Sequence, residues 1–152
     1  MSTHLIQTQI ELNASAEQVW TVLVDFAAYP EWNPFIRSAV GVPERGARIH
    51  IAVQPKGGKV MHFSPVVLVA QAGRELRWRG QLPLPGMFAG EHSFIIEPMG
   101  ERTVRFQHSE RFSGILVGLL RASLDRDTQR GFEDMNRALK LRAEQRRSDL
   151  VR

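Results

Sequence analysis

Two histidines and one glutamate are the residues of this sequence best suited to acid–base chemistry. His92, His108 and Glu110 lie in two segments, 88–97 and 103–112, in which apolar and polar residues alternate as in half-buried strands. The even-numbered positions carry the large apolar side chains, so the three polar groups share the inward face. An imidazole tuned by a carboxylate transfers protons near neutral pH. If the protein is an enzyme, we predict His108 or His92 as the acid or base, oriented by Glu110.

The same three residues also have a structural interpretation. A buried polar group without a partner costs about 1–3 kcal/mol, so these groups must pair with one another, reach water or meet a ligand. Their types also suit zinc, but no H-E-x-x-H spacing supports a metal site, and we predict neither metal nor cofactor. The sequence has no G-x-S-x-G elbow and no glycine-rich phosphate-binding motif.

The longest amphipathic segment lies at the C-terminal end of the sequence and predicts one helix from about Ile115 to Arg147. Its apolar residues recur every three or four positions, which is the helical period. A helix of about 30 residues is about 45 Å long, enough to lie across a small curved sheet. The apolar row consists of Leu116, Leu120, Leu124, Phe132, Met135 and Leu139.

Seven segments before this helix have the alternation typical of strands. Short glycine-containing links join most of them, and such links require antiparallel pairing. Ser15 and Gln18 form a capping box that starts a helix running to about Phe26, and the turn 27–34 follows. The predicted fold is α+β: a seven-stranded antiparallel sheet curved around the C-terminal helix, with two short helices between the first two strands. The strand segments are 4–12, 35–42, 47–54, 59–71, 74–81, 88–97 and 103–112.

Length and composition limit the class of protein. The chain has 152 residues, no cysteine and a net charge of +4. We expect a single domain over residues 1–147 with a frayed tail at 148–152, and a monomer or weak dimer. No stretch resembles a signal peptide or membrane span, so we expect a cytoplasmic protein. The aromatic side chains of the predicted strands point inward and the arginines outward, which argues against a nucleic-acid partner.

The inward faces of the strands and the apolar row of the helix predict a hydrophobic pocket with polar groups near one end. The Trp32 turn either gates this pocket or anchors the turn as a structural plug. The residues that we expect to contact a ligand are Trp32, Phe63, Trp78, Phe88, His92, Phe94, Phe106, His108, Glu110, Leu116, Leu120 and Leu124.

Several motifs resemble those of the START/Bet v 1-like (SRPBCC) superfamily, in particular its bacterial polyketide cyclase/dehydrase branch. The likeness covers nearly the whole chain. It implies a helix-grip fold with a hydrophobic cavity for a lipid, polyketide, quinone or similar molecule. The motifs are IELNASAEQVW at 10–20, DF at 25–26, YPEWNPF at 29–35, GEH at 90–92, FSG at 112–114 and FEDMN at 132–136.

Three functions remain open on the sequence. The first is non-enzymatic carriage or presentation of an apolar ligand. The second is a cyclase or dehydratase that uses the inward histidines and Glu110. The third is a module that docks transiently on a membrane or a protein through the apolar segments 82–87 and 114–120.

Overall fold

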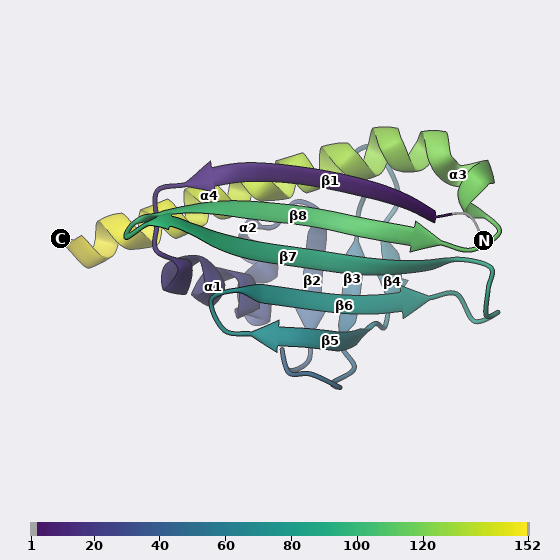
Figure 1. Ribbon diagram of the computed structural model, residues 1–152, viewed down its shortest axis with the longest axis horizontal. Coiled ribbons are helices and arrows are strands. Elements are labelled where there is room, and N and C mark those ends of the chain that lie inside the picture. Colours follow the sequence, from purple (N-terminus) through teal and green to yellow (C-terminus); the bar gives the residue numbers. More distant parts are fainter. Residues whose placement is uncertain (1–2, 152) are drawn as a thin grey trace.

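Five antiparallel strands form the larger of two sheets (Figure 1). The structure is a computed structural model that describes residues 3–151, with side chains for 3–145. Each strand pairs with its neighbour, with register shifts only between Val67 and Val69 and between Pro98 and Gly100. His92 on one strand lies directly opposite Glu110 on the next. In spatial order the strands are β1 (Thr3–Leu12), β8 (Thr103–Ser113), β7 (Ala89–Gly100), β6 (Glu75–Gln81) and β5 (Val66–Gln71).

The second sheet has three strands, β2 (Ile36–Val40), β3 (His50–Val53) and β4 (Met61–Phe63). The prediction of a single seven-stranded sheet is therefore wrong in its count, because the segment 59–71 forms two strands. The chain breaks at Ser64-Pro65, where proline has no N–H to continue a ladder. Residues before β3 bridge the two sheets, since Ile49 N donates to Pro65 O at 2.9 Å and Arg48 pairs with Val66.

Two short helical segments separate β1 from β2, as predicted. Helix α1 (Ala16–Val24) starts with the expected capping box: the Gln18 backbone N–H donates to Ser15 Oγ, and the Ser15 N–H donates to Gln18 Oε1. The turn η1 (Phe26–Ala28) and the short helix α2 (Tyr29–Trp32) follow. Asn33 then accepts the backbone N–H groups of Phe35 and Ile36 through Oδ1, which directs the chain into β2.

The C-terminal helix is continuous but not uniform. It consists of α3 (Val117–Ser123), the π-helical turn η2 (Leu124–Thr128) and α4 (Gln129–Val151). Figure 1 shows it lying along β1 and across the five-stranded sheet. The expected tail at 148–152 falls on residues whose side chains lie outside the described part, and it stays a prediction. Within that part, no helix is both long enough and apolar enough to cross a membrane.

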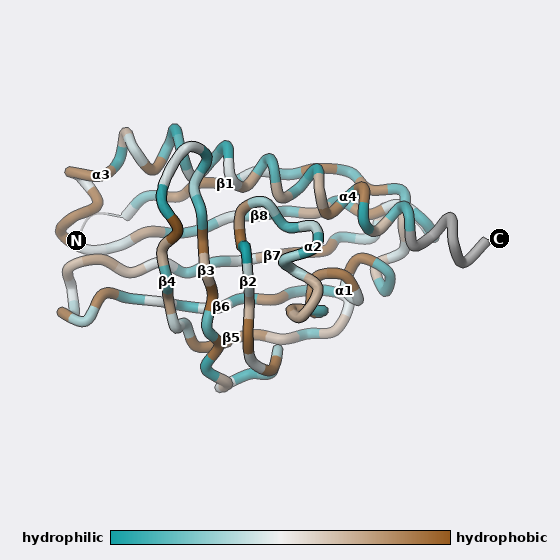
Figure 2. The backbone as a smooth tube through the Cα atoms, turned by 180° about the vertical axis from the view of Figure 1, so that it is seen from behind, coloured by the Kyte–Doolittle hydropathy of each residue, from teal (hydrophilic) through white to brown (hydrophobic). Residues whose placement is uncertain are grey.

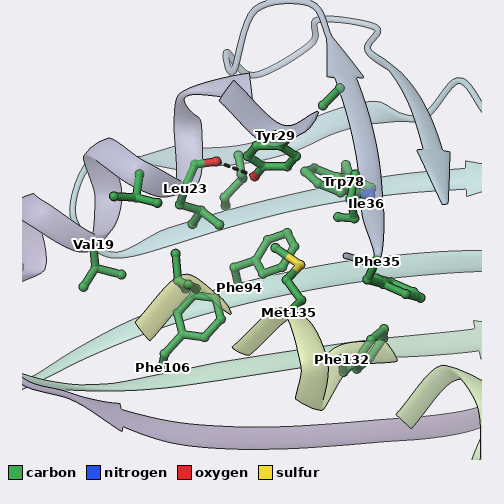
Figure 3. Packing of buried hydrophobic residues seen from close by; sticks show 14 of the residues in the cluster. Val19, Leu23, Tyr29, Phe35, Ile36, Trp78, Phe94, Phe106, Phe132 and Met135 are labelled. Carbon is green, nitrogen blue, oxygen red and sulfur yellow. Dashed lines mark hydrogen bonds between the residues drawn. The ribbon is translucent and has the colours of Figure 1, made fainter. Parts of the chain in front are cut away.

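The hydrophobic core fills the end of the fold beneath α4, α1 and α2 (Figure 3). Phe94 and Phe106 from the large sheet meet Phe132 and Met135 from α4, and all four are fully buried. Burial raises the pKa of Tyr29, whose hydroxyl donates to the carbonyl of Leu23. The opposite end of the fold, beneath α3 and η2, holds the pocket described next.

Candidate functional site

A pocket of about 410 Å³ lies between the two sheets and the segment that joins α3 to η2. Its wall is mostly apolar, and the three-stranded sheet supplies one side of it. The large sheet supplies the other side, where the polar groups His92 and Glu110 stand among aromatic side chains. Strand alternation accounts for this wall, because every second side chain of β6, β7 and β8 faces inward.

Seven of the twelve residues expected to contact a ligand line this pocket. They are Phe63, Trp78, Phe88, His92, Glu110, Leu120 and Leu124. Four others do not: Phe94, Phe106 and His108 are fully buried in the core, and Leu116 lies half-buried just before α3. Their assignment as contact residues remains a prediction.

The twelfth, Trp32, is half-buried in α2 and does not line the pocket. Its ring packs edge-on against Tyr29 at a centroid distance of 5.2 Å. The side-chain nitrogen Nε1 of Trp32 is buried and has no hydrogen-bond partner among the described residues. This placement fits a structural plug better than a gate.

His108 lies behind the pocket wall, between two phenylalanine rings. Its imidazole stacks on Phe132 at a centroid distance of 4.0 Å and an angle of 14°, and Phe94 packs at 4.7 Å. Burial holds the pKa of His108 well below its usual value, and the neighbouring His92 lowers this pKa further, whereas the hydrogen bond to Oδ1 of Asn136 raises it. His108 is therefore a neutral ring at neutral pH.

A chain of hydrogen bonds runs from the pocket wall into the core. Nε2 of His92 and Nε2 of His108 are 2.7 Å apart, and Nδ1 of His108 is 2.8 Å from Oδ1 of Asn136 on α4. Nδ2 of Asn136 donates to Oγ1 of Thr8 at 2.9 Å, and Thr8 donates to the backbone carbonyl of His108 at 3.0 Å. On the pocket side, Nδ1 of His92 lies 3.3 Å from Oε1 of Glu110. The chain thus connects Glu110 with three buried polar side chains and β1.

The side chain of Glu110 on β8 lies over Gly90 on β7, two residues before His92, which is the direct strand partner of Glu110. A Cβ atom at Gly90 would collide with Oε2 of Glu110. Oε2 has no hydrogen-bond partner among the described residues, although its carboxylate lines the pocket and is 18% exposed. The carboxylate is therefore held in place through Oε1 while Oε2 stays available to an occupant of the pocket.

Sequence reasoning missed several residues of this site. Thr8 falls at an inward position of β1, between Ile6 and Ile10, and Asn136 lies one turn after Phe132 on α4. Both positions carried a periodicity signal, but nothing in the sequence showed that they would meet across the fold. The other lining residues that were missed are Phe35, Ile36, Ile51, Val53, Pro55, Met61, Pro65, Gly80, Gln81, Leu82, Gly90, Phe112, Ser123, Asp127 and Thr128.

The described residues include no group of three or more His, Cys, Asp or Glu side chains placed to hold a metal ion. Glu110, His92 and His108 follow one another along a line, with each group facing the next. The arrangement can hold and pass protons between ring nitrogens and a carboxylate.

Solved structures with this fold include both enzymes and a START-superfamily protein. The Zhui aromatase/cyclase from a Streptomyces species is 16% identical, with a TM-score of 0.78 over 95% of this chain and 96% of that chain. A START superfamily protein from Mycobacterium smegmatis is 24% identical, with a TM-score of 0.68 over 93% and 98%. Norcoclaurine synthase from Thalictrum flavum is 14% identical, with a TM-score of 0.74 over 96% and 97%. These likenesses establish the helix-grip fold.

No curated protein matches the chain. A family model described as polyketide cyclase / dehydrase and lipid transport matches residues 3–144, which is almost the entire described chain. The match confirms the resemblance noted in the sequence motifs along the chain. The chain belongs to the family described as polyketide cyclase / dehydrase and lipid transport.

Proposed function

We propose that this protein binds an apolar small molecule, such as a lipid, polyketide or quinone, in the pocket between its sheets and its C-terminal helix, for carriage or presentation. The observation that supports it is the pocket itself, about 410 Å³ and lined mainly by aromatic and aliphatic side chains. The side chains facing it include Phe63, Trp78 and Phe88, which offer large apolar surfaces at little conformational cost.

The energetics allow useful affinity. A ligand that buries about 450 Å² of apolar surface gains about 11 kcal/mol at 25 cal/mol per Å². The loss of translational and rotational freedom costs at least about 4 kcal/mol. The remaining 7 kcal/mol or so corresponds to a dissociation constant in the micromolar range.

Native mass spectrometry of the purified protein with a panel of apolar compounds tests this function. We expect one-to-one complexes that are lost in Val53→Phe, because Val53 lines the pocket and the larger ring fills it. Val40→Phe is the matched control, since Val40 is 64% exposed and is absent from the pocket wall. Failure of every apolar compound to bind, or equal binding to both variants, would reject the proposal.

A second candidate function is proton-transfer catalysis on the bound molecule, as in a cyclase or dehydratase. The chain from Glu110 through His92 to His108 favours it, because a plain carrier needs no such buried network. Glu110 and His92 line the pocket and would contact the substrate, whereas His108 and Asn136 would position them. His108, first in our sequence prediction as acid or base, would thus act through His92.

A short poly-β-keto thioester offers a direct test of the catalytic alternative, with cyclised or dehydrated products detected by mass spectrometry. Glu110→Gln should lower turnover at least tenfold while the substrate still binds. Glu91→Gln, on the outer face of the same sheet beside Arg77, should leave turnover unchanged. Product formation that is equal in Glu110→Gln and the parent protein would remove Glu110 from any catalytic role.

A further inference from the structure

The direction of the hydrogen-bond chain is fixed at its buried end. The backbone carbonyl of His108 can only accept, so the Thr8 hydroxyl must donate to it. The single hydroxyl hydrogen of Thr8 is then in use, so Thr8 can only accept from Asn136. Asn136 must therefore direct its NH2 group toward Thr8 and its carbonyl oxygen Oδ1 toward His108. Nδ1 of His108 therefore carries a hydrogen.

The same direction passes on to His92. Because His108 is neutral and its hydrogen is on Nδ1, its Nε2 has a free lone pair. The Nε2 atoms of the two rings are 2.7 Å apart, so His92 must donate through its own Nε2–H. The backbone of β8 thus sets the tautomer of a ring at the pocket wall.

His92 and Glu110 must then share one proton. A neutral His92 with its hydrogen on Nε2 would turn the lone pair of Nδ1 toward the carboxylate, and the two would repel. One proton between Nδ1 and Oε1, which are 3.3 Å apart, removes the repulsion. The ring of Trp78, centred 5.3 Å from that of His92, also favours a cationic imidazole.

Either position of the shared proton leaves Oε2 of Glu110 as an acceptor. If the proton is on His92, Glu110 is a carboxylate, and if it is on Oε1, then Oε2 is the carbonyl oxygen of the acid. Oε2 lies over Gly90, at the surface of the pocket. An occupant meets a hydrogen-bond acceptor there and must supply the donor.

The polar groups of the wall disfavour anionic ligands. No Lys or Arg side chain lines the pocket among the described residues. Asp127 adds a second carboxylate at the η2 side, and a hydrogen bond from Arg126 holds its pKa below the usual range. A bound carboxylate would therefore find no lysine or arginine in the wall, and its oxygens would face Oε2 of Glu110, which can only accept a hydrogen bond.

We propose that the ligand is an apolar molecule with a hydroxyl group at one end, a phenol, enol or alcohol, whose O–H donates to Oε2 of Glu110. The inference rests on the proposed binding function and narrows it to one ligand class. It sets hydroxylated ring compounds and alcohols apart from fatty acids, which an apolar pocket alone would also accept.

Three naphthalene probes of similar size test the ligand class at pH 7 by isothermal titration calorimetry. We expect 2-naphthol to bind at least about tenfold more tightly than 2-methoxynaphthalene, which keeps the oxygen but cannot donate, because hydrogen bonds to a charged group are strong. 2-Naphthoate should bind most weakly. Equal affinity for the naphthol and its methyl ether, or tightest binding of the naphthoate, overturns this inference but leaves the pocket's function intact. Failure of all three to bind overturns this inference, and the binding function falls with it only if the wider apolar panel also fails.

Two further measurements locate the effect. In Glu110→Gln the amide can donate to Nδ1 of His92 and then presents a neutral carbonyl oxygen to the ligand, so the advantage of 2-naphthol and the 2-naphthoate penalty should both shrink. Glu91→Gln on the outer face should keep the parent affinity ratios. Unchanged affinity ratios in Glu110→Gln contradict the inference. Nitrogen-15 NMR of the ligand-free protein should show a hydrogen on Nδ1 of His108 and on Nε2 of His92. A hydrogen on Nε2 of His108 would overturn the argument without any ligand.

Discussion

Gly90 makes room for Glu110. The two residues lie on neighbouring strands, and a Cβ at Gly90 would collide with Oε2 of the carboxylate. The backbone of Gly90 does not have a positive φ, so no turn requires glycine at this place near the start of β7. Glycine in a strand costs stability and often marks a close approach of another group. Here the group that approaches is the carboxylate at the pocket wall.

Gly90→Ala should displace Glu110 and weaken binding of hydroxylated ligands. The new methyl group forces the carboxylate away from its position over residue 90, so Oε2 can no longer accept a hydrogen bond from the ligand. We expect 2-naphthol to lose its advantage of about tenfold over 2-methoxynaphthalene, the worth of one hydrogen bond to a charged group. Calorimetric titration with both probes measures the change.

Gly80→Ala provides the matched control for this experiment. Gly80 lies directly opposite Gly90 on β6 and also lines the pocket. An added Cβ there meets only Pro65, at 3.6 Å from its Cβ, which is an ordinary contact. The preference for 2-naphthol should survive in Gly80→Ala, and its loss in both variants would show that Glu110 is not the cause.

His108 should make stability fall at acidic pH. Burial lowers the pKa of His108 in the folded state well below 6.5. Between that pKa and pH 6.5, His108 is protonated in the unfolded chain but not in the folded chain. The unfolded state therefore gains protons first as the pH falls, and folding loses about 1.4 kcal/mol per pH unit below about pH 6.5 until the folded pKa is reached. Above pH 6.5 the contribution is fully present. Urea unfolding at pH 7.5 and 5.5 measures the difference.

Replacing the ring isolates this contribution from that of the other titrating groups. The groups that face His108 are His92 from β7, Asn136 from α4 and Thr8 from β1. His108→Gln lowers stability at both pH values but should lose the extra decline between them. His62→Gln, at an exposed position of β4, should keep the parent's decline. An identical decline in the parent and His108→Gln would contradict the assignment.

Strand alternation was enough to predict which face each polar residue takes, but not how deep it lies. His92 and His108 both point inward, and both are buried. One lines the pocket and the other packs against Phe132 in the core. Depth depends on where α4 crosses the sheet, and side-chain periodicity within one strand carries no information about that crossing. The partners of His108, Thr8 and Asn136, are equally non-local.

Irregularities in the backbone could not be predicted from the alternation of apolar and polar residues either. Between Val67 and Val69 a bulge shifts the register of β5, so Val69 lies opposite Arg77 rather than on the inward face with Val67 that simple alternation predicts. In the helix, side chains spaced by four turn about 40° per step at 3.6 residues per turn. The leucines at 116, 120 and 124 therefore point in progressively different directions around the helix axis. The wider π turn η2 offsets part of this rotation and brings Asp127 and Thr128 to the pocket.

Gly131→Ala should destabilise the fold although it improves helix propensity. Gly131 lies in α4, where alanine is favoured over glycine by about 1 kcal/mol. A Cβ at this position would collide with the ring of Phe35, which packs between α4 and the pocket. Overpacking of this kind costs about 1–3 kcal/mol, so the net effect is a loss of up to about 2 kcal/mol. Urea denaturation measures it.

Gly118→Ala makes the same chemical change without the collision. Gly118 is exposed in α3, and a Cβ there would meet nothing within 4 Å. The propensity gain should then appear alone, as a stabilisation of up to about 1 kcal/mol. Stabilisation of both variants would mean that Phe35 yields at little cost and that its position does not limit the pocket.

The two apolar segments that flank the pocket mouth are joined by backbone hydrogen bonds. Ile115 N donates to Gly86 O at 3.1 Å, and Leu116 N donates to Met87 O at 3.0 Å. Their contact also requires Gly114, whose Cβ would lie 2.5 Å from the Met87 carbonyl oxygen. The result is an apolar rim formed by Leu84, Ile115 and Leu119, which are 66%, 68% and 81% exposed. Hydrophobic residues gather at this end of the molecule, around the start of α3 (Figure 2).

If the rim docks on a membrane during ligand uptake, Leu84→Ser with Leu119→Ser should weaken vesicle binding at least about tenfold, because burying one leucine side chain contributes about 1.5–3 kcal/mol. Co-sedimentation with phosphatidylcholine–phosphatidylglycerol vesicles measures this, and circular dichroism checks that the variant is folded. Leu141→Ser is the control, since Leu141 is 63% exposed on α4, away from the pocket wall. Equal sedimentation of the parent and the double variant would leave the rim the simpler role of closing the pocket, because exposed leucines that cost nothing to replace make no contact that the function needs.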